Sequence, residues 1–300
     1  MSKIRASQLF LTLTAACALA LTACGGGGGG DTIVQNPKSR ADEGVWINSD
    51  GETMHAVILD DGSYWRTYGI FADGAFSSIN LISHGTASIN GNNVSGAYSN
   101  FPDGYSTSES YPYANGTYSG TVSAKNSISL TFNDPTSSGK SLAMNYDGIF
   151  NQPASLAAIS GTYLPGGTLT IFCPAGDACP PPTRPNSPNL TISGSSLTLL
   201  DGNGEVAMTG TIAPHGTTVN VFDVSLTTTT ASPIANIPAG ETLHITTPSS
   251  ATPPFNYNVP AGAIFNGILF QTSDEQAKNY IEIVTSSGDS AFYFMGSKQN

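Results

Sequence analysis

The chain has 300 residues, a formal net charge of −11 at pH 7 and only 10% charged side chains. It therefore lacks the basic footprint that nucleic acid or an anionic lipid surface needs for electrostatic binding. Its 33 glycines and 19 prolines, together with abundant Ser, Thr and Asn, favour short strands and tight turns over long surface helices. Hydrophobic residues still make up 39% and fall in alternating runs, so a packed core is expected.

The N-terminus has the pattern of an export signal. Lys3 and Arg5 precede an apolar run, Leu9–Leu21, that is too short to span a bilayer comfortably and ends in small residues. Residues 21–24 read Leu-Thr-Ala-Cys, and six glycines follow, Gly25–Gly30. An ordinary signal peptide, with the cysteine near its cleavage site by chance, is the alternative.

The Leu-Thr-Ala-Cys ending resembles the lipobox of bacterial lipoproteins, in which the chain is cut just before the cysteine and the cysteine is acylated. By this resemblance residues 1–23 are the signal peptide and Cys24 is the lipidation site. Removing residues 1–23 takes away two bases and no acid, so the formal charge falls from −11 to −13. The mature chain would then be held at the membrane by its acyl chains rather than by charge.

The polyglycine run after Cys24 resembles the leader of surface lipoproteins of Gram-negative bacteria. The transferrin-binding protein B, factor H-binding protein and heparin-binding antigen group carries such a leader on β-barrel domains. The resemblance covers residues 21–30 and implies a lipid-anchored protein of the outer membrane, since Gly25 stands where aspartate would imply retention at the inner membrane. It leaves open which face of the outer membrane the protein occupies, and it names no partner.

The remaining cysteines allow one disulfide. Cys17 leaves with the signal and Cys24 is the lipid site, so Cys173 and Cys179 remain. An exported compartment permits a bridge between them, which would contribute on the order of 2 kcal/mol because the closed loop is short. A metal site would need more thiols or a nearby histidine pair, so no metal is expected.

The rest of the chain predicts a flexible linker and two β domains. Residues 24–42 form the linker, residues 43–155 the first domain and residues 156–300 the second. Gly44-Val45-Trp46 is echoed by Gly161-Thr162-Tyr163, which suggests two related halves. The expected fold is all-β and antiparallel, with two tandem barrel-like or sandwich halves; one fused sheet system is the alternative.

Three hairpins are predicted in the first half from their turn residues. They are centred on residues 60–62 (Asp-Asp-Gly), 90–93 (Asn-Gly-Asn-Asn) and 124–126 (Ala-Lys-Asn). A further strand is expected over 141–150, and a connector or one helical turn over 153–159. The second half predicts strands at 161–163, 168–172, 190–192, 196–200, 206–212, 218–226, 243–246, 264–270, 280–285 and 291–295, with Pro-rich loops at 179–188 and 248–260.

No catalytic or cofactor-binding constellation emerges. The histidines His55, His84, His215 and His244 lack a metal-ligand spacing, and each is expected at the surface or in a turn. The adjacent Asp60 and Asp61 suit a turn better than a pair of catalytic carboxylates facing each other across a cleft. No nucleophile elbow or phosphate-binding glycine loop is present either, so no enzyme activity and no cofactor are predicted.

The stretch from residue 98 to residue 118 carries the candidate binding residues. Tyr105, Tyr111 and Tyr113 stand there among Ser, Asn, Asp and Gly, a mixture that recognition loops use for proteins and sugars. The alternative is that Tyr98 and Tyr118 are core or girdle residues of strands and that the other tyrosines close a barrel end. Trp46 and Trp65 are expected inside the first half.

Three functions remain open from the sequence. The first is a non-catalytic lipoprotein that uses loops on a β scaffold to bind a protein or a glycan. The second is a carrier of a small apolar ligand inside a calycin-like barrel. The third is a hydrolase with dispersed catalytic residues.

Overall fold

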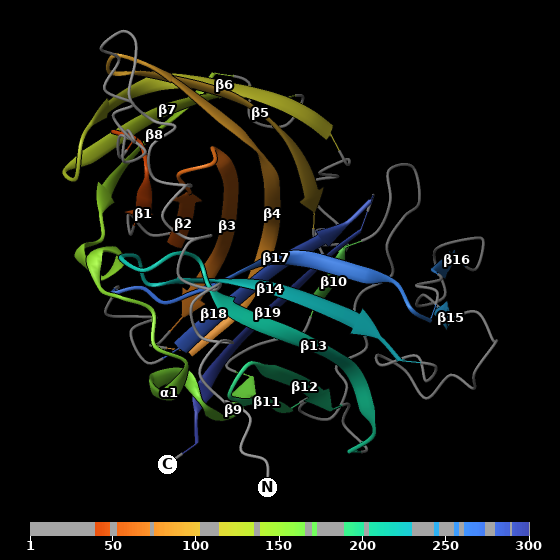
Figure 1. The fold of residues 1–300 in the computed structure, drawn as a ribbon. Helices are drawn as coiled ribbons and strands as arrows, with labels where there is room; N and C mark the ends of the chain where they lie inside the picture. The colour runs from red at the N-terminus through yellow and green to blue at the C-terminus, as the bar shows by residue number, and fades with distance from the viewer. Residues whose placement is uncertain are drawn as a thin grey trace, which may run out of the picture. The chain divides into compact units, whose positions relative to one another are not determined.

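The computed structural model describes residues 40–48, 53–72, 75–102, 114–134, 139–165, 170–172, 189–200, 204–229, 243–245, 255–257, 261–273, 280–288 and 290–299. All of them belong to one compact unit, residues 39–300. The predicted fold class is confirmed: the unit is all-β and contains two closed antiparallel barrels of eight strands each (Figure 1).

The first barrel, barrel 1, runs through eight strands in sequence order, each paired with the next. Trp46 and Ile47 of the first strand pair with Tyr146 and Asn145 of the last, which closes the barrel. The strands are β1 (Gly44–Asn48), β2 (Thr53–Ile58), β3 (Ser63–Ala72), β4 (Ala75–Asn90), β5 (Asn93–Pro102), β6 (Ala114–Ser123), β7 (Ser127–Asn133) and β8 (Lys140–Tyr146).

The three predicted hairpins are the β2–β3, β4–β5 and β6–β7 pairs. Their turns need residues that accept a positive φ: Gly62 (83°), Gly91 (60°) and Lys125 (54°). In the first turn the Asp61 carboxylate accepts the Ser63 amide at 2.7 Å, so Asp61 stabilises the turn through its side chain.

Alternation along the strands fills the interior of barrel 1. In β7 the residues Ile128, Leu130 and Phe132 are buried while their neighbours are half-buried or exposed. Two tyrosines lie over glycines of the neighbouring strand, because Gly96 pairs with Tyr118 and Gly116 with Tyr98. A Cβ at either glycine would come within 2.5 Å of the facing tyrosine ring, so these positions have room only for glycine.

The second barrel, barrel 2, is closed by pairing between its first and last strands. Its strands in order around the barrel are β9 (Gly161–Pro165), β11 (Asn189–Ser193), β12 (Ser196–Leu200), β13 (Val206–Pro214), β14 (Val221–Thr228), β17 (Ile264–Phe270), β18 (Tyr280–Ser287) and β19 (Ser290–Lys298). A short strand, β10 (Thr170–Phe172), also pairs with β19, and β15 (Leu243–Ile245) and β16 (Phe255–Tyr257) form a separate two-stranded sheet.

Three sequence expectations need correction. The strand expected over 141–150 ends at Tyr146, because Asp147 caps a 3-10 helix, η1 (Gly148–Asn151), by accepting the Ile149 amide. The predicted Pro-rich loop 248–260 contains β16, and the strand expected over 86–89, before the second turn, already begins at Ala75 as β4. Residues 153–159 do contain one helical turn, α1 (Leu156–Ile159), capped by Ser155. The expected domain boundary at 155/156 falls in this connector.

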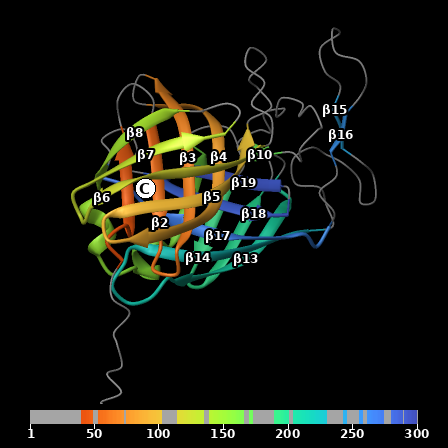
Figure 2. The same cartoon turned by 90° about the horizontal axis from the view of Figure 1, so that it is seen from above.

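The barrels pack against each other through their outer walls. Val57, Trp65 and Ile82 of barrel 1 share one apolar cluster with Phe270 and Tyr293 of barrel 2. The two interiors form the other two clusters. Strands β17–β19 of barrel 2 therefore lie against the outer wall around β2–β4 (Figures 1 and 2). Trp46 lies in the interior of barrel 1 as expected, whereas Trp65 lies between the barrels.

Candidate functional site

The two ends of barrel 1 differ in the chain connections that they carry. Residues 49–52, 73–74, 103–113 and 135–138 lie in the connections from β1 to β2, β3 to β4, β5 to β6 and β7 to β8. Because neighbouring strands are antiparallel, all four connections belong to one end, the loop end. The three tight turns belong to the opposite end, the turn end, where the chain also enters β1 from Arg40.

The residues singled out from the sequence lie outside the described part of the chain. Tyr105, Tyr111 and Tyr113 belong to the 103–113 connection at the loop end, and Cys24, Cys173 and Cys179 are also outside it. Tyr98 and Tyr118, by contrast, are 3% and 2% exposed in the interior of barrel 1.

A buried arginine lies in the interior of barrel 1. Arg66 is 2% exposed, and its Nε and Nη2 donate to Ser83 Oγ at 3.1 and 2.9 Å. Nη2 also donates to Asn100 Oδ1 at 3.1 Å. The guanidinium carbon lies 4.2 Å from the ring centroid of Phe132 and 5.1 Å from that of Tyr98, so the charge is stabilised by two aromatic faces as well as by hydrogen bonds.

Asp134 extends this network to the loop end. It directly follows β7, is 4% exposed, and accepts from the Tyr98 hydroxyl at 2.5 Å and from Asn100 Nδ2 at 3.2 Å. Burial, and then the hydrogen bond to Asp134, raise the pKa of Tyr98 above its ordinary value, so Tyr98 stays a donor at neutral pH. We call Arg66, Ser83, Tyr98, Asn100 and Asp134 the interior network.

Two members of the interior network lie at the loop end of barrel 1. Asn100 lies near the end of β5, from which that connection leaves, and Asp134 lies where the 135–138 connection begins. Each member is held by at least one hydrogen bond, and a satisfied buried network fixes its side chains in one arrangement. Within these five residues no serine or cysteine lies beside a histidine base.

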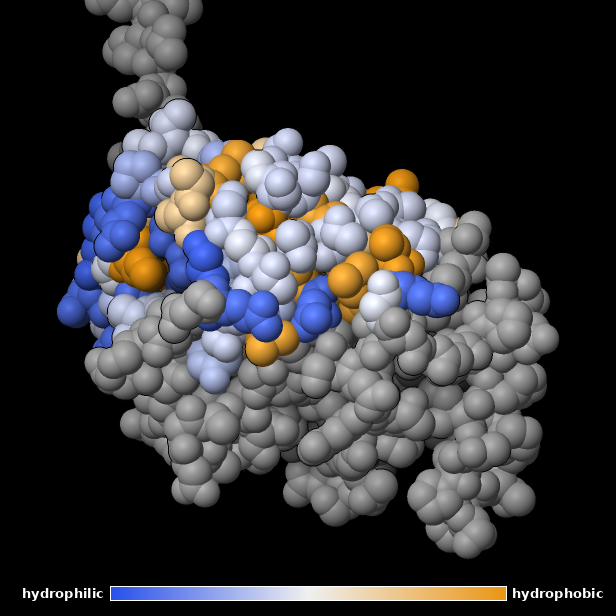
Figure 3. Space-filling view, turned by 90° about the horizontal axis from the view of Figure 1, so that it is seen from below, coloured by the Kyte–Doolittle hydropathy of each residue, from blue (hydrophilic) through white to orange (hydrophobic). Residues whose placement is uncertain are grey.

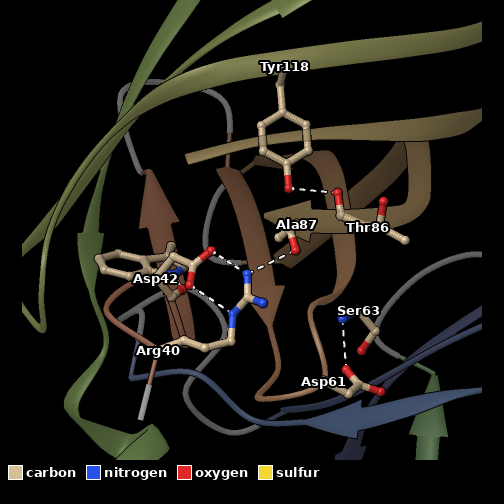
Figure 4. A network of polar contacts seen from close by, with 8 residues as sticks. Arg40, Asp42, Asp61, Ser63, Thr86, Ala87 and Tyr118 are labelled. Carbon is tan, nitrogen blue, oxygen red and sulfur yellow. Dashed lines mark hydrogen bonds and ion pairs between the residues drawn. The ribbon is translucent and has the colours of Figure 1, made fainter. Parts of the chain in front are cut away.

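The turn end is closed by the segment that enters β1 (Figure 4). Arg40 makes two parallel bonds to the Asp42 carboxylate, at 3.0 and 2.9 Å, and its Nη2 also donates to the Ala87 carbonyl at 2.9 Å. The Trp46 indole donates to the Asp42 carbonyl at 3.0 Å, and the Tyr118 hydroxyl to the Thr86 carbonyl at 3.1 Å. The bond from Arg40 to the Ala87 carbonyl therefore links the entering chain to β4.

A buried polar cluster joins the two barrels. His55 Nδ1 lies 2.6 Å from Glu282 Oε1, and Glu282 Oε2 accepts from Thr67 at 3.3 Å and from Tyr293 at 3.0 Å. His55 and Glu282 are each 2% exposed, so the expectation that every histidine lies at the surface or in a turn is wrong for His55. The outer wall of β2 is covered by barrel 2, which no pattern within β2 could reveal.

Two further histidines contact both barrels. His84 stacks on Trp65 with ring centroids 3.8 Å apart, and its Nδ1 lies 3.0 Å from Ser286 Oγ. His215 lies between Asp223, at 2.6 Å, and Asp60 of the first tight turn, at 3.2 Å. Burial works to lower the pKa of His215, but the hydrogen bonds and charges of Asp223 and then Asp60 outweigh it and raise the pKa.

The described residues hold no cluster of three or more His, Cys, Asp or Glu side chains that could bind a metal ion. Within the same residues, no helix has the length and apolar character to cross a membrane.

No protein-family model matches this sequence, and no curated protein matches it either. The candidate site therefore rests on the geometry of the chain itself. Sequence reasoning missed the interior network, although β3 carried a signal: Tyr64, Arg66 and Tyr68 share one face of a strand whose other face bears Trp65 and Thr67.

Proposed function

We propose that the protein is a non-catalytic lipoprotein, anchored through Cys24 to the outer membrane, that binds a protein or glycan partner with the connections at the loop end of barrel 1. The observation that carries the proposal is topological. All four of these connections belong to one end of barrel 1, and the chain that would lead back to the lipid enters at the opposite end. Loops on a rigid β scaffold are a common means of recognition.

The composition of the four connections narrows the partner. They contain three tyrosines, which supply large contact area at low conformational cost, among Ser, Thr and Gly. They contain no Lys or Arg and five acids: Asp50, Glu52, Asp73, Asp103 and Glu109. A neutral or basic partner surface therefore suits this end better than an anionic one.

No observation favours the alternative of an apolar-ligand carrier. The described interior of barrel 1 is filled by side chains such as Trp46, Tyr64 and Phe132, and that of barrel 2 by Phe222 and Phe265. A carrier barrel would instead leave room for its ligand.

Anchoring is tested by labelling cells with an alkyne analogue of palmitate and comparing the intact chain with Cys24→Ser. The intact protein should take up the label and fractionate with the outer membrane, and the variant should do neither. Protease shaving of intact cells then locates the face: cleavage while a periplasmic control survives means that the protein faces outward. Equal labelling of both chains would contradict the lipoprotein assignment.

Binding is tested with the triple substitution Tyr105→Ser, Tyr111→Ser and Tyr113→Ser. A photo-crosslinking amino acid at Ser108 should give discrete adducts in cells, whereas one at Thr131, exposed on the barrel wall, should not. The triple variant should lose the adducts formed at Ser108 while its melting temperature stays within a few degrees. A large drop in melting temperature would show that the tyrosines belong to the core instead.

A further inference from the structure

On the outer wall of barrel 1 from β4 to β8, the exposed outward positions that the structure describes carry no charged side chain. These positions carry only Ser, Thr, Asn and Ala, although about a quarter of the residues of an average soluble domain are charged. They are Thr86, Ser88, Asn90, Asn93, Ser95, Ala97, Asn115, Thr117, Ser119, Thr121, Ser123, Ser129, Thr131, Asn133, Ser141, Ala143 and Asn145. Elsewhere on the molecule, a space-filling view from below shows strongly hydrophilic residues among apolar ones (Figure 3).

Near the turn end this wall is hollowed. A depression of about 450 Å³ lies over β4, β5 and β6 and is lined by nine residues, six of them polar and outward-facing. Strand register sets these six in two rows that cross the three strands. One row is Ser88, Ser95 and Ser119, and the other is Asn90, Asn93 and Thr121.

The six polar side chains are open to a ligand. None of them makes a side-chain hydrogen bond to another described residue, whereas nearby pairs on the same wall do, such as Thr131 with Ser141 and Ser99 with Asn115. Each serine or threonine hydroxyl can donate once and accept twice, and each asparagine amide offers both kinds of group.

The hollow is also rigid. Its strands are paired on both sides, and the interior side chains behind it, Val94, Tyr118 and Val122, are at most 4% exposed. Hydroxyl and amide groups held at fixed spacings on such a wall lose little freedom when a ligand binds, which lowers the cost of binding.

We infer that this hollow, defined as Ser88, Asn90, Asn93, Ser95, Ser119 and Thr121, is a binding site for a neutral polysaccharide. Sugar hydroxyls donate and accept as these side chains do, and neither partner carries a charge. The site lies on the wall near the turn end, apart from the loop end, so it stands whether or not the loop end binds a partner.

Other ligand classes fit the hollow less well. Phosphate and nucleic acid need basic groups, and the hollow has none. Protein interfaces are centred on aromatic, Met and Arg side chains, which are also absent from its lining. Its apolar lining consists of Ile89 and the nearly buried Val94, so an apolar ligand would find little surface.

The absence of an aromatic platform from the lining predicts how the site binds. A single sugar would make only hydrogen bonds in competition with water, so its affinity should be too weak to detect in a gel. A long chain can place successive sugars along the two rows of the hollow, and repeated contacts raise the apparent affinity without any new kind of contact.

The test is native electrophoresis of the purified full-length protein in mild detergent, through gels containing dextran, mannan or laminarin. Mobility is compared with that in a plain gel, and alginate serves as the anionic reference. At least one neutral polymer should retard the protein. Ser95→Arg with Ser119→Arg fills the hollow and should weaken retardation at least tenfold, whereas Ala143→Arg, exposed on β8, should leave it within twofold.

A milder variant controls for misfolding caused by the arginine substitutions. Ser88→Ala with Ser95→Ala and Ser119→Ala removes one row of hydroxyls without adding bulk and should weaken retardation several-fold at an unchanged melting temperature. The proposal is overturned if no neutral polymer retards the protein, if only alginate does, or if the hollow variants bind as well as Ala143→Arg.

Discussion

The two barrels have the same strand number and opposite interiors. The described interior of barrel 2 is a cluster of aliphatic and aromatic side chains, and none of the buried charged residues lies in it. Barrel 1 encloses an arginine, an aspartate, an asparagine and a serine in one hydrogen-bonded network beside Tyr98 and Phe132. Closure of an eight-stranded barrel therefore does not require a polar interior, because barrel 2 closes without one.

The difference indicates that the polar interior of barrel 1 serves something other than closure. Burying polar groups costs free energy that hydrogen bonds only offset, and an apolar interior of the same volume is often equally stable or more so. Departures from the simplest packing tend to lie near functional sites. Here the polar residues include Asn100 and Asp134, which lie near the strand ends from which two of the proposed binding loops leave.

The largest loss of stability is expected when apolar volume is removed from the interior of barrel 2. Phe292→Ala leaves a cavity in the apolar interior of barrel 2. The free energy of unfolding should therefore fall by about 3–5 kcal/mol. Denaturant unfolding measures this loss. Crosslinking through Ser108 should persist under conditions where the variant is folded, because Phe292 lies in the other barrel; its loss from a folded variant would contradict the separation of roles.

A smaller effect is expected when the cation of barrel 1 is removed. Arg66→Met keeps the length and the apolar contacts of the side chain, but it removes the hydrogen bonds to Ser83 and Asn100 and the cation that Asn100 links to Asp134. The free energy of unfolding should therefore fall by about 2–4 kcal/mol. Denaturant unfolding again measures the change. Adding Asp134→Asn should restore part of the loss, because a buried carboxylate is then no longer left without its linked cation.

The same two variants test whether the interior network supports the loop end or only stabilises the fold. If the interior network supports the loop end, Arg66→Met with Asp134→Asn should recover stability without recovering the adducts formed at Ser108. Recovery of both would mean that the network contributes stability alone, and the contrast between the two interiors would then have no functional meaning.

The smallest expected effect concerns the contact between the barrels at His215. Its pKa is raised above the ordinary value of about 6.5, so protonated His215 stabilises the fold. This contribution is complete below about pH 6.5 and is lost as the pH rises through the higher folded pKa. Because both carboxylate partners are more than half exposed, it should stay below about 1 kcal/mol.

Melting curves of the intact chain and His215→Gln should therefore differ at pH 5.5 and coincide well above pH 7. Glu43 faces the same cluster, and burial and then Asp60 raise its pKa, so the comparison is repeated in a Glu43→Gln background. A difference between the two chains that grows with pH would contradict the direction of the His215 shift.

Local sequence chemistry predicted most of the fold. Asp61-Gly62, Asn90-Gly91 and Ala124-Lys125-Asn126 located three hairpins, and the paired openings at Gly44 and Gly161 both begin the first strand of a barrel. These succeed because turn conformation and side-chain alternation depend on neighbours in sequence.

The missed features depend on residues far apart in the chain. Nothing near Arg66 indicates that Asn100 and Asp134 will meet it, and nothing near His55 indicates Glu282, which lies more than two hundred residues away. The hollow was missed for a related reason: Ser88, Ser95 and Ser119 are ordinary surface serines until strand register aligns them. The predicted tyrosine loop and disulfide lie outside the described residues and stay predictions.

The pairing of β9 with β19 also sets the order in which the fold can be completed during synthesis. Barrel 1 has all its strands once residue 146 has been made, but β9 must wait for β19 at residues 290–298. Until then the cover over the outer wall of β1–β4 is incomplete, and β9 and β18 are open edges, which are templates for aggregation. A chain that stops before Ser290 would leave both hazards in place, so premature termination should yield aggregates instead of a usable first barrel.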